Sequence, residues 1–184
     1  KATNDLKGSH NVININENNQ INHSSIKNFI YFKENLIASS KILSFLGISE
    51  NKSLIAFNTF KGLPHRMEFF LKKGKLTFIN DSKATNAEAT LRALEYYKNI
   101  FWIAGGISKS GGIENSIKNL GNVKKCFLIG ESKNEFFNIL NNKLDCSISD
   151  TIEKALEEIY HETINLSDET TVLLSPAAAS YDQF

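Results

Sequence analysis

Arginine, proline, cysteine and methionine are scarce in this sequence. Two prolines, two cysteines and one methionine occur among its 184 residues, and Arg66 and Arg92 are the two arginines. Cys126 and Cys146 fit no metal-binding spacing, so we expect reduced, partly buried thiols in a cytosolic protein. Lysine cannot replace the bidentate fork of a guanidinium, so each arginine is a candidate for a specific role.

The chain also lacks a strong net charge and a long apolar run. Its formal net charge is +1, which gives no electrostatic argument for binding nucleic acid or an anionic membrane. No apolar stretch approaches the length of a membrane span, and residues 1–5 lack the apolar core of a secretion signal. A hydrophobic content of 41% is enough for one domain, or for one domain plus a part of another.

The residues before position 50 give weaker signals than the rest. Residues 1–30 are rich in asparagine, and the alternation at 12–16 predicts a short strand followed by a turn. From Asn35 the apolar spacing predicts a helix of roughly three turns that ends at Gly47. Residues 49–52 are read as a polar connector, so we expect one domain portion at 1–50 and a second domain at 51–184.

Strands and helices alternate from Leu76 onward. This order predicts an α/β fold with a doubly wound, mostly parallel, Rossmann-like sheet, to which a hairpin over 67–79 adds an antiparallel strand. The expected helices cover about 86–97, 113–120, 133–140 and 151–163, with a last helix from Pro176, and the expected strands cover 100–104, 125–129 and 170–174 with a short extended piece near 146.

One strand-to-helix junction, residues 78–88, carries the densest group of reactive side chains. The apolar run ends in Asp81, and Ser82, Lys83 and Thr85 follow before the helix. Thr85 with Glu88 matches a capping box, which explains the threonine without any ligand. A helix N-terminus beside a lysine is also a natural seat for phosphate or carboxylate, so both interpretations stay open.

Two other strand ends have polar residues after them. Gly105 and Gly106 lead to Lys109, but this loop fits neither the Walker nor the dinucleotide-binding pattern. Ser175 is read as a helix N-cap before Pro176, and Ser180 is close enough to that helix start to donate to a carboxylate. Three strand ends could therefore converge on one edge of the sheet.

A basic pair, His65 and Arg66, follows a proline turn. An exposed pair is the default interpretation, although a guanidinium is well suited to phosphate.

Together these stretches resemble the Mur ligase family, and within it the branch that adds D-glutamate. The resemblance covers about 35–184 and is carried by Gly62-Leu63-Pro64-His65-Arg66-Met67-Glu68, Asn80-Asp81-Ser82-Lys83-Ala84-Thr85-Asn86, Gly105-Gly106 with Lys109, and Leu173-Leu174-Ser175-Pro176-Ala177-Ala178-Ala179-Ser180 with Asp182-Gln183-Phe184. The order and the spacing of these motifs match those of the family throughout. Asn35 is matched by its spacing to Gly47, although Tyr31 and Phe32 stand where the family shows His-Asn.

The resemblance implies the tail of a central ATPase domain followed by most of a Rossmann-like C-terminal domain. It implies that Asn35, Arg66 and Asp81 bind ATP, that Thr85, Lys109 and Ser180 bind D-glutamate, and that His65 and Lys83 line the catalytic cleft. No protein metal ligand is expected in this chain.

The activity implied is ATP-dependent amide formation with Mg²⁺ in peptidoglycan synthesis, by a cytoplasmic monomer. UDP-N-acetylmuramoyl-L-alanine would be phosphorylated to an acyl phosphate and attacked by the D-glutamate amine. The chain has no phosphate-cradling P-loop, so it is expected to be inactive without the missing N-terminal and central domains of the protein. The alternatives are a non-catalytic Rossmann-like binding module and a sister Mur ligase that adds another amino acid.

Overall fold

A computed structural model describes residues 33–108, 113, 120–162 and 166–179 of the chain. The chain divides into two compact units, Lys1–Lys61 and Gly62–Phe184. This division lies later than the predicted boundary at residue 50, because the residues after that point form a helix that packs on the helix before it. None of the described helices is long and apolar enough to cross a membrane.

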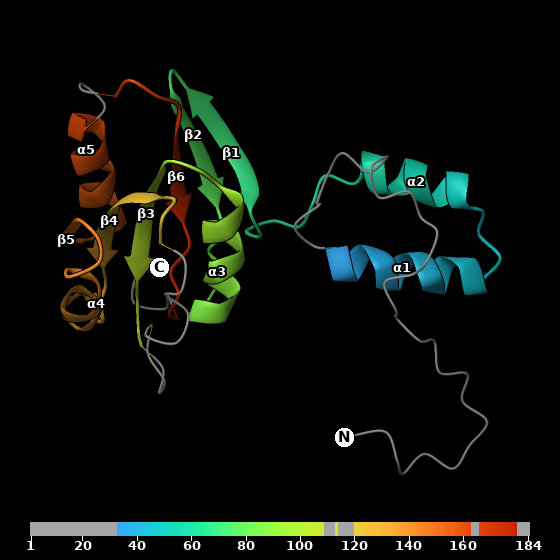
Figure 1. The fold of residues 1–184 in the computed structure, drawn as a ribbon, viewed down its shortest axis with the longest axis horizontal. Coiled ribbons are helices and arrows are strands. Elements are labelled where there is room, and N and C mark those ends of the chain that lie inside the picture. The colour runs from blue at the N-terminus through green and yellow to red at the C-terminus, as the bar shows by residue number, and fades with distance from the viewer. Residues whose placement is uncertain (1–32, 109–112, 114–119, 163–165, 180–184) are drawn as a thin grey trace, which may run out of the picture. The chain divides into compact units, whose positions relative to one another are not determined.

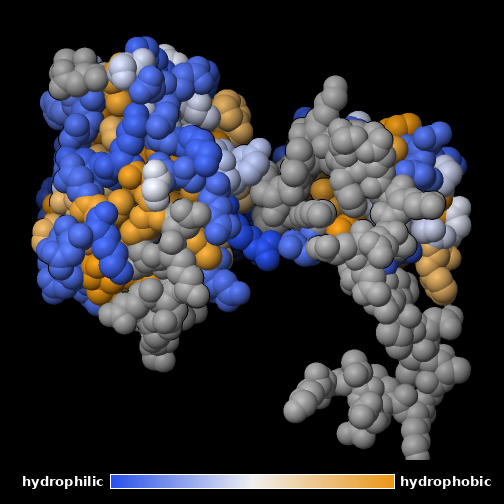
Figure 2. Space-filling model, in the orientation of Figure 1, coloured by the Kyte–Doolittle hydropathy of each residue, from blue (hydrophilic) through white to orange (hydrophobic). Residues whose placement is uncertain are grey.

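The first unit contains a helix pair, α1 (Lys33–Phe45) and α2 (Glu50–Thr59). Gly47 ends α1 as predicted, with φ +76° and hydrogen bonds from its own N–H to Ser44 and from the Ile48 N–H to Leu43. This 5→2 and 6→1 pair is a Schellman motif. The predicted polar connector at 49–52 is wrong, since it begins α2. Figure 2 shows apolar side chains at the surface of this unit. Phe45 and Leu46 are two of its exposed apolar residues.

The second unit is built on one six-stranded sheet (Figure 1), which confirms the predicted α/β fold. The strand order is β1-β2-β6-β3-β4-β5, in which the β1–β2 pair is antiparallel and the other pairs are parallel. The strands are β1 (Glu68–Lys73), β2 (Leu76–Asn80), β3 (Ile100–Gly105), β4 (Val123–Ile129), β5 (Cys146–Asp150) and β6 (Thr170–Leu174).

Three described helices accompany the sheet: α3 (Ala87–Tyr96), α4 (Lys133–Leu140) and α5 (Ile152–Glu162). Connections through α3 and α4 advance across the sheet in one direction, whereas α5 leads back to β6. Because parallel crossovers are right-handed, α3 and α4 cover one face and α5 the other. On the α5 face, Ala155 and Ile159 pack against Phe101, Ile103 and other strand residues.

The hairpin predicted over 67–79 has a two-residue turn. Lys73 pairs with Leu76, so the turn is Gly74-Lys75, and Gly74 has φ +59°. A glycine with positive φ at the first turn position is typical of two-residue hairpins, because it matches the twist of the strands.

The predicted strand at 12–16 and most of the predicted helix at 113–120 fall outside the described residues. The helix predicted from Pro176 is wrong over 175–179, which are not helical. Ala177 has φ +58° and its N–H donates to the Ala84 carbonyl at 3.0 Å, so the backbone leaves the helical path at once.

Candidate functional site

The carboxyl ends of β2, β6 and β3 lie side by side, because β6 is hydrogen-bonded between the other two strands. This confirms the prediction that three strand ends meet at one edge of the sheet. Ligands of open α/β folds bind outside the carboxyl ends of such strands. The candidate site therefore lies at this edge.

Asp81, which directly follows β2, is buried and held by two hydrogen bonds to its carboxylate. Met67 donates its N–H to Oδ1 at 3.1 Å, and Ser175 donates its hydroxyl to Oδ2 at 2.8 Å. A further hydrogen bond of 3.0 Å joins the Ser175 hydroxyl to that of Thr90 in α3. These bonds tie the β1–β2 hairpin, β6 and α3 to one carboxyl group.

Burial raises the pKa of Asp81 above its ordinary value of 3.8. The hydrogen bonds from Ser175 and Met67 and the positive charge of Arg66 oppose that rise. Two lone pairs remain on the carboxylate after both bonds are formed, so Asp81 can still accept a hydroxyl group. Asp81 is only 6% exposed, and its clearest role in this structure is to fasten the strand ends together.

Ser175 is a residue of this edge whose structural role was not predicted from the sequence. It was predicted to be an N-cap, but it is fully buried, and its carbonyl accepts the indole N–H of Trp102 at 2.8 Å. No local pattern reveals this, because its partners lie far away in the chain.

Arg66 sits between two residues with left-handed backbone conformations. His65 has φ 63° and Met67 has φ 47°, values that non-glycine residues adopt uncommonly and often at functional sites. Two hydrogen bonds of the His65 backbone stabilise this turn. The His65 N–H donates to Glu68 Oε2 at 2.8 Å, and the His65 carbonyl accepts the Lys83 N–H at 3.1 Å. The basic pair and the loop after β2 therefore form one surface.

The N-cap of α3 is Asn86, not the predicted Thr85. The Asn86 side chain accepts the Ala89 N–H at 2.8 Å and its backbone is extended, as an N-cap requires. The capping box of Thr85 with Glu88 is therefore wrong. Thr85 stands just outside the helix, half-buried, so capping no longer explains its presence.

Main-chain hydrogen bonds connect the loops along this edge. Gly105 donates its N–H to the Pro176 carbonyl at 2.9 Å, and Ile107 and Ala179 form an antiparallel bridge. Further along, the Ser132 N–H donates to the Gly106 carbonyl at 2.7 Å. Backbone groups thus fix the relative positions of the loops after β3, β4 and β6.

The structure brings five of the eight sequence candidates to this edge: His65, Arg66, Asp81, Lys83 and Thr85. The side chains of Arg66, Lys83 and Thr85 form no hydrogen bond with another described residue. Lys109 and Ser180 lie outside the described residues, one or two positions beyond the bridged loops. Asn35 is an exposed residue of α1, in the other compact unit.

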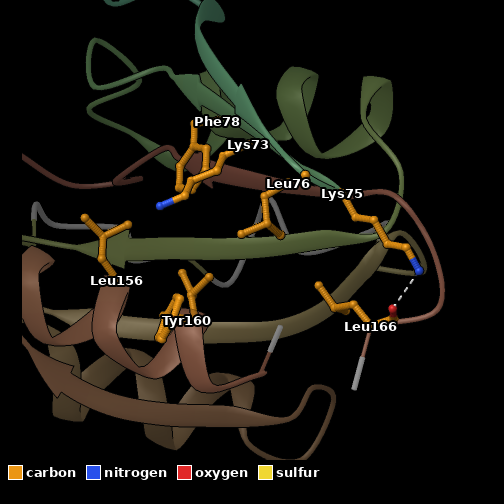
Figure 3. Close-up of a pocket in the computed structure, with 9 residues that line it drawn as sticks. Lys73, Lys75, Leu76, Phe78, Leu156, Tyr160 and Leu166 are labelled. Carbon is orange, nitrogen blue, oxygen red and sulfur yellow. Dashed lines mark hydrogen bonds between the residues drawn. The ribbon is translucent and has the colours of Figure 1, made fainter. Parts of the chain in front are cut away.

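A cavity of about 500 Å³ lies at the opposite end of β2 (Figure 3). It lies between the hairpin turn and α5, where Lys75 donates its ammonium group to the Leu166 carbonyl at 3.0 Å. Its apolar lining consists of Leu76, Phe78, Leu156, Ile159, Tyr160 and Leu166. Leu76 begins β2 whereas Asp81 follows its end, so the cavity is separate from the candidate site.

Solved structures identify the class of this fold. The chain superposes on MurC, a UDP-N-acetylmuramate-alanine ligase from Thermotoga maritima, with a TM-score of 0.61 and 16% identity, over 80% of this chain and 34% of that one. A MurF ligase from Thermotoga maritima in complex with ADP gives a TM-score of 0.55 and 20% identity, with the same two coverages. The fold is that of a portion of the Mur ligases.

Curated relatives narrow the comparison to one branch. The chain is 43% identical over 169 residues to the UDP-N-acetylmuramoylalanine-D-glutamate ligase of Wolbachia pipientis wMel, covering 91% of this chain and 33% of the relative. It is 42% identical over 151 residues to the ligase of the same name from Caulobacter vibrioides, covering 82% of this chain and 32% of the relative.

These matches confirm the resemblance to the Mur ligase family. The chain spans about one third of the length of these curated relatives. A search of family models gave no match.

Proposed function

We propose that this chain supplies the D-glutamate side, and part of the ATP side, of an ATP-dependent ligase. That ligase would join D-glutamate to UDP-N-acetylmuramoyl-L-alanine in peptidoglycan synthesis, in the cytoplasm and as a monomer. The observation that carries the proposal is the shared edge of β2, β6 and β3, where five of the candidate residues lie: His65, Arg66, Asp81, Lys83 and Thr85. The relatives' printed name supports D-glutamate as the amino acid.

The proposed amino-acid site uses Thr85, Lys109 and Ser180. D-glutamate carries two carboxylates, which call for an ammonium group and hydroxyl donors in a partly dry place. The three residues stand in, or directly beyond, loops whose backbones are joined to one another, which supports a common site. The nearby N-terminus of α3 adds a partial positive charge.

The proposed nucleotide side uses Arg66 for phosphate and Asp81 for ribose; the family resemblance assigns Asn35 to ATP as well. His65 and Lys83 would line the cleft between the two substrates. In the reaction, a carboxylate oxygen attacks the γ-phosphorus and ADP leaves. The D-glutamate amine then attacks the acyl phosphate and expels inorganic phosphate. A guanidinium stabilises the charge that develops on phosphoryl oxygens, which suits the exposed Arg66.

Mg²⁺ belongs to the proposal through the family resemblance, with most of its ligands in residues outside this chain. In the part of the chain that the structure describes, no three His, Cys, Asp or Glu side chains gather as a metal site.

Titration of the purified chain with D-glutamate tests the amino-acid site. We expect saturable binding by NMR, with L-glutamate much weaker, and a large loss in Lys109→Ala. Lys143→Ala is the matched control, because Lys143 is exposed on a turn after α4. Equal loss in the two lysine variants, or no preference for the D-enantiomer, would contradict the proposed site.

Activity distinguishes a ligase portion from a non-catalytic binding module. The chain alone should release no ADP in the presence of both substrates, because it has no phosphate-cradling loop. Expressed within the complete reading frame, Lys109→Ala should mainly raise the apparent KM for D-glutamate. A complete natural protein without a Gly-x-x-Gly-Lys-Ser/Thr loop would instead favour the binding module.

A further inference from the structure

Cys126 and Cys146 are direct partners across two neighbouring parallel strands. Cys126 lies within β4, Cys146 is the first residue of the edge strand β5, and the two are paired in register. Register partners in a parallel pair point to the same face of the sheet, and neighbouring strands lie about 4.8 Å apart. That spacing falls within the range of about 4.4–6.8 Å between Cα atoms that a disulfide spans.

The two thiols differ in their access to solvent. Cys126 is fully buried, whereas Cys146 is half-buried, and both are free thiols. A hydrogen bond from the Cys126 thiol lowers the pKa of Cys146, while burial raises the pKa of Cys126 well above its usual value. Cys146 is therefore the thiol that forms a thiolate more readily and that a reagent can reach.

We propose that Cys126 and Cys146 are a redox modification site, at which Cys146 attacks an external disulfide and Cys126 then resolves the adduct into an intrachain disulfide. The inference is independent of the ligase function, because it rests on β4 and β5 and not on the strand ends that hold the candidate site.

The oxidant is a low-molecular-weight disulfide such as glutathione disulfide. The Cys146 thiolate attacks one sulfur, forms a mixed disulfide and expels one thiolate. The Cys126 thiol loses its proton and attacks the Cys146 sulfur, which expels the second thiolate. In sum, two protein thiols lose two electrons and two protons, and one external disulfide becomes two thiols.

The product would fasten the edge strand to the interior of the sheet. β5 ends at Asp150, whose carboxylate binds Lys133 of α4 at 2.9 Å and Lys154 of α5 at 3.4 Å. A link at the first residue of β5 would close a loop that contains α4, which restricts the unfolded chain. We expect the oxidised chain to unfold at a higher denaturant concentration than the reduced chain.

The experiment incubates the purified chain with glutathione disulfide, blocks remaining thiols after unfolding and measures the intact mass and its peptides. The expected product has lost two hydrogens, carries no blocking group and yields a peptide pair linked through Cys126 and Cys146. Dithiothreitol should restore both thiols. A chain that keeps two alkylatable thiols, or that stops at a glutathione adduct, would overturn the proposal.

Single substitutions separate the two roles. Cys126→Ala should accumulate glutathione on Cys146, because the resolving thiol is gone. Cys146→Ala should react far more slowly while folded, because the remaining thiol is buried. Alanine is used because a buried free cysteine behaves as a small apolar residue. Equal reaction rates of the two folded variants, each checked by circular dichroism, would refute the assigned order of attack.

Discussion

Ser175 donates its hydroxyl to Asp81 at 2.8 Å, across 94 positions of the chain. The bond joins the end of β6 to the end of β2, and both residues are buried. Because a buried carboxylate is costly unless it accepts hydrogen bonds, the arrangement of the candidate site depends on this pair. Five substitutions probe the edge that the pair supports.

Ser175→Ala should destabilise the second unit by about 1–3 kcal/mol, because it leaves a buried Asp81 oxygen without its donor. Denaturant unfolding of both proteins measures the difference. The matched control is Ser167→Ala, which removes an exposed serine hydroxyl that donates to Asp168 at 3.1 Å. That control should change the free energy of unfolding by less than about 0.5 kcal/mol. If both variants lost similar amounts of unfolding free energy, the buried hydrogen bond would contribute no more to stability than the exposed one.

Asp81→Asn should change how stability depends on pH. Because the folded pKa of Asp81 is raised above 3.8, the folded state holds its proton more tightly than the unfolded state. This contribution is fully present below the unfolded pKa and is lost as pH rises through the folded pKa. Asparagine does not titrate, so the wild-type chain should lose stability relative to the variant over that rise.

Unfolding free energies of the Asp81→Asn and wild-type chains, measured at intervals from about pH 3 to about pH 7, test this sign. A wild-type advantage that grows with pH would show that the Ser175, Met67 and Arg66 interactions outweigh burial, and that the pKa is lowered.

Asn86→Ala and Thr85→Ala should separate helix capping from ligand binding. Asn86→Ala removes the N-cap of α3 and should cost about 1 kcal/mol of unfolding free energy. Thr85→Ala should cost less than about 0.5 kcal/mol, since its hydroxyl binds no other described residue, yet it should weaken D-glutamate binding. Unfolding and D-glutamate titration are measured on both variants. If Thr85→Ala were as destabilising as Asn86→Ala and left binding intact, Thr85 would have no place in the site.

Gly105→Ala should be severely destabilising, because β3 and β4 approach each other too closely for a side chain there. A Cβ at this position would lie 2.0 Å from the Ile129 carbonyl oxygen, and Gly105 has φ +127°. The loss should exceed the about 1–3 kcal/mol that backbone strain alone costs.

Two matched glycines control for the Gly105 result. Gly74→Ala adds strain at φ +59° in open space, and Gly121→Ala adds a methyl group with nothing within 4 Å. Unfolding should rank Gly105→Ala worst and Gly121→Ala mildest. A Gly105→Ala chain as stable as Gly74→Ala would show that the strands can move apart at little cost.

The sequence predicted the sheet and the meeting of its strand ends because both follow from local periodicity and chain order. Alternating strands and helices from Leu76 imply parallel pairing, and polar residues after each strand then fall at one edge. The predictions failed where two local solutions compete. The polar residues at 49–52 suit a connector as well as the first turn of a helix, and they begin α2, which packs on α1.

Within the site, residue types were predictable but partners were not. Thr85 and Asn86 are both good N-cap residues, and only the backbone path shows that the helix begins at Ala87. Ser175 was predicted to be a helix N-cap because Pro176 follows it. In the structure its hydroxyl is hydrogen-bonded to Asp81 and Thr90, which are distant in the chain. Long-range hydrogen bonds of this kind leave no trace in the spacing of neighbouring residues.

The position of β6 has a consequence for biosynthesis. This strand lies between β2 and β3, so among the described strands the hairpin side and the β3–β4–β5 side of the sheet are hydrogen-bonded to each other only through it. A ribosome completes Thr170–Leu174 after all the other strands of the sheet. Until that segment leaves the exit tunnel, the nascent chain holds two partial sheets whose inner strands are unpaired. Such edges are prone to wrong pairing, so a chaperone at the tunnel exit has its greatest value during this interval.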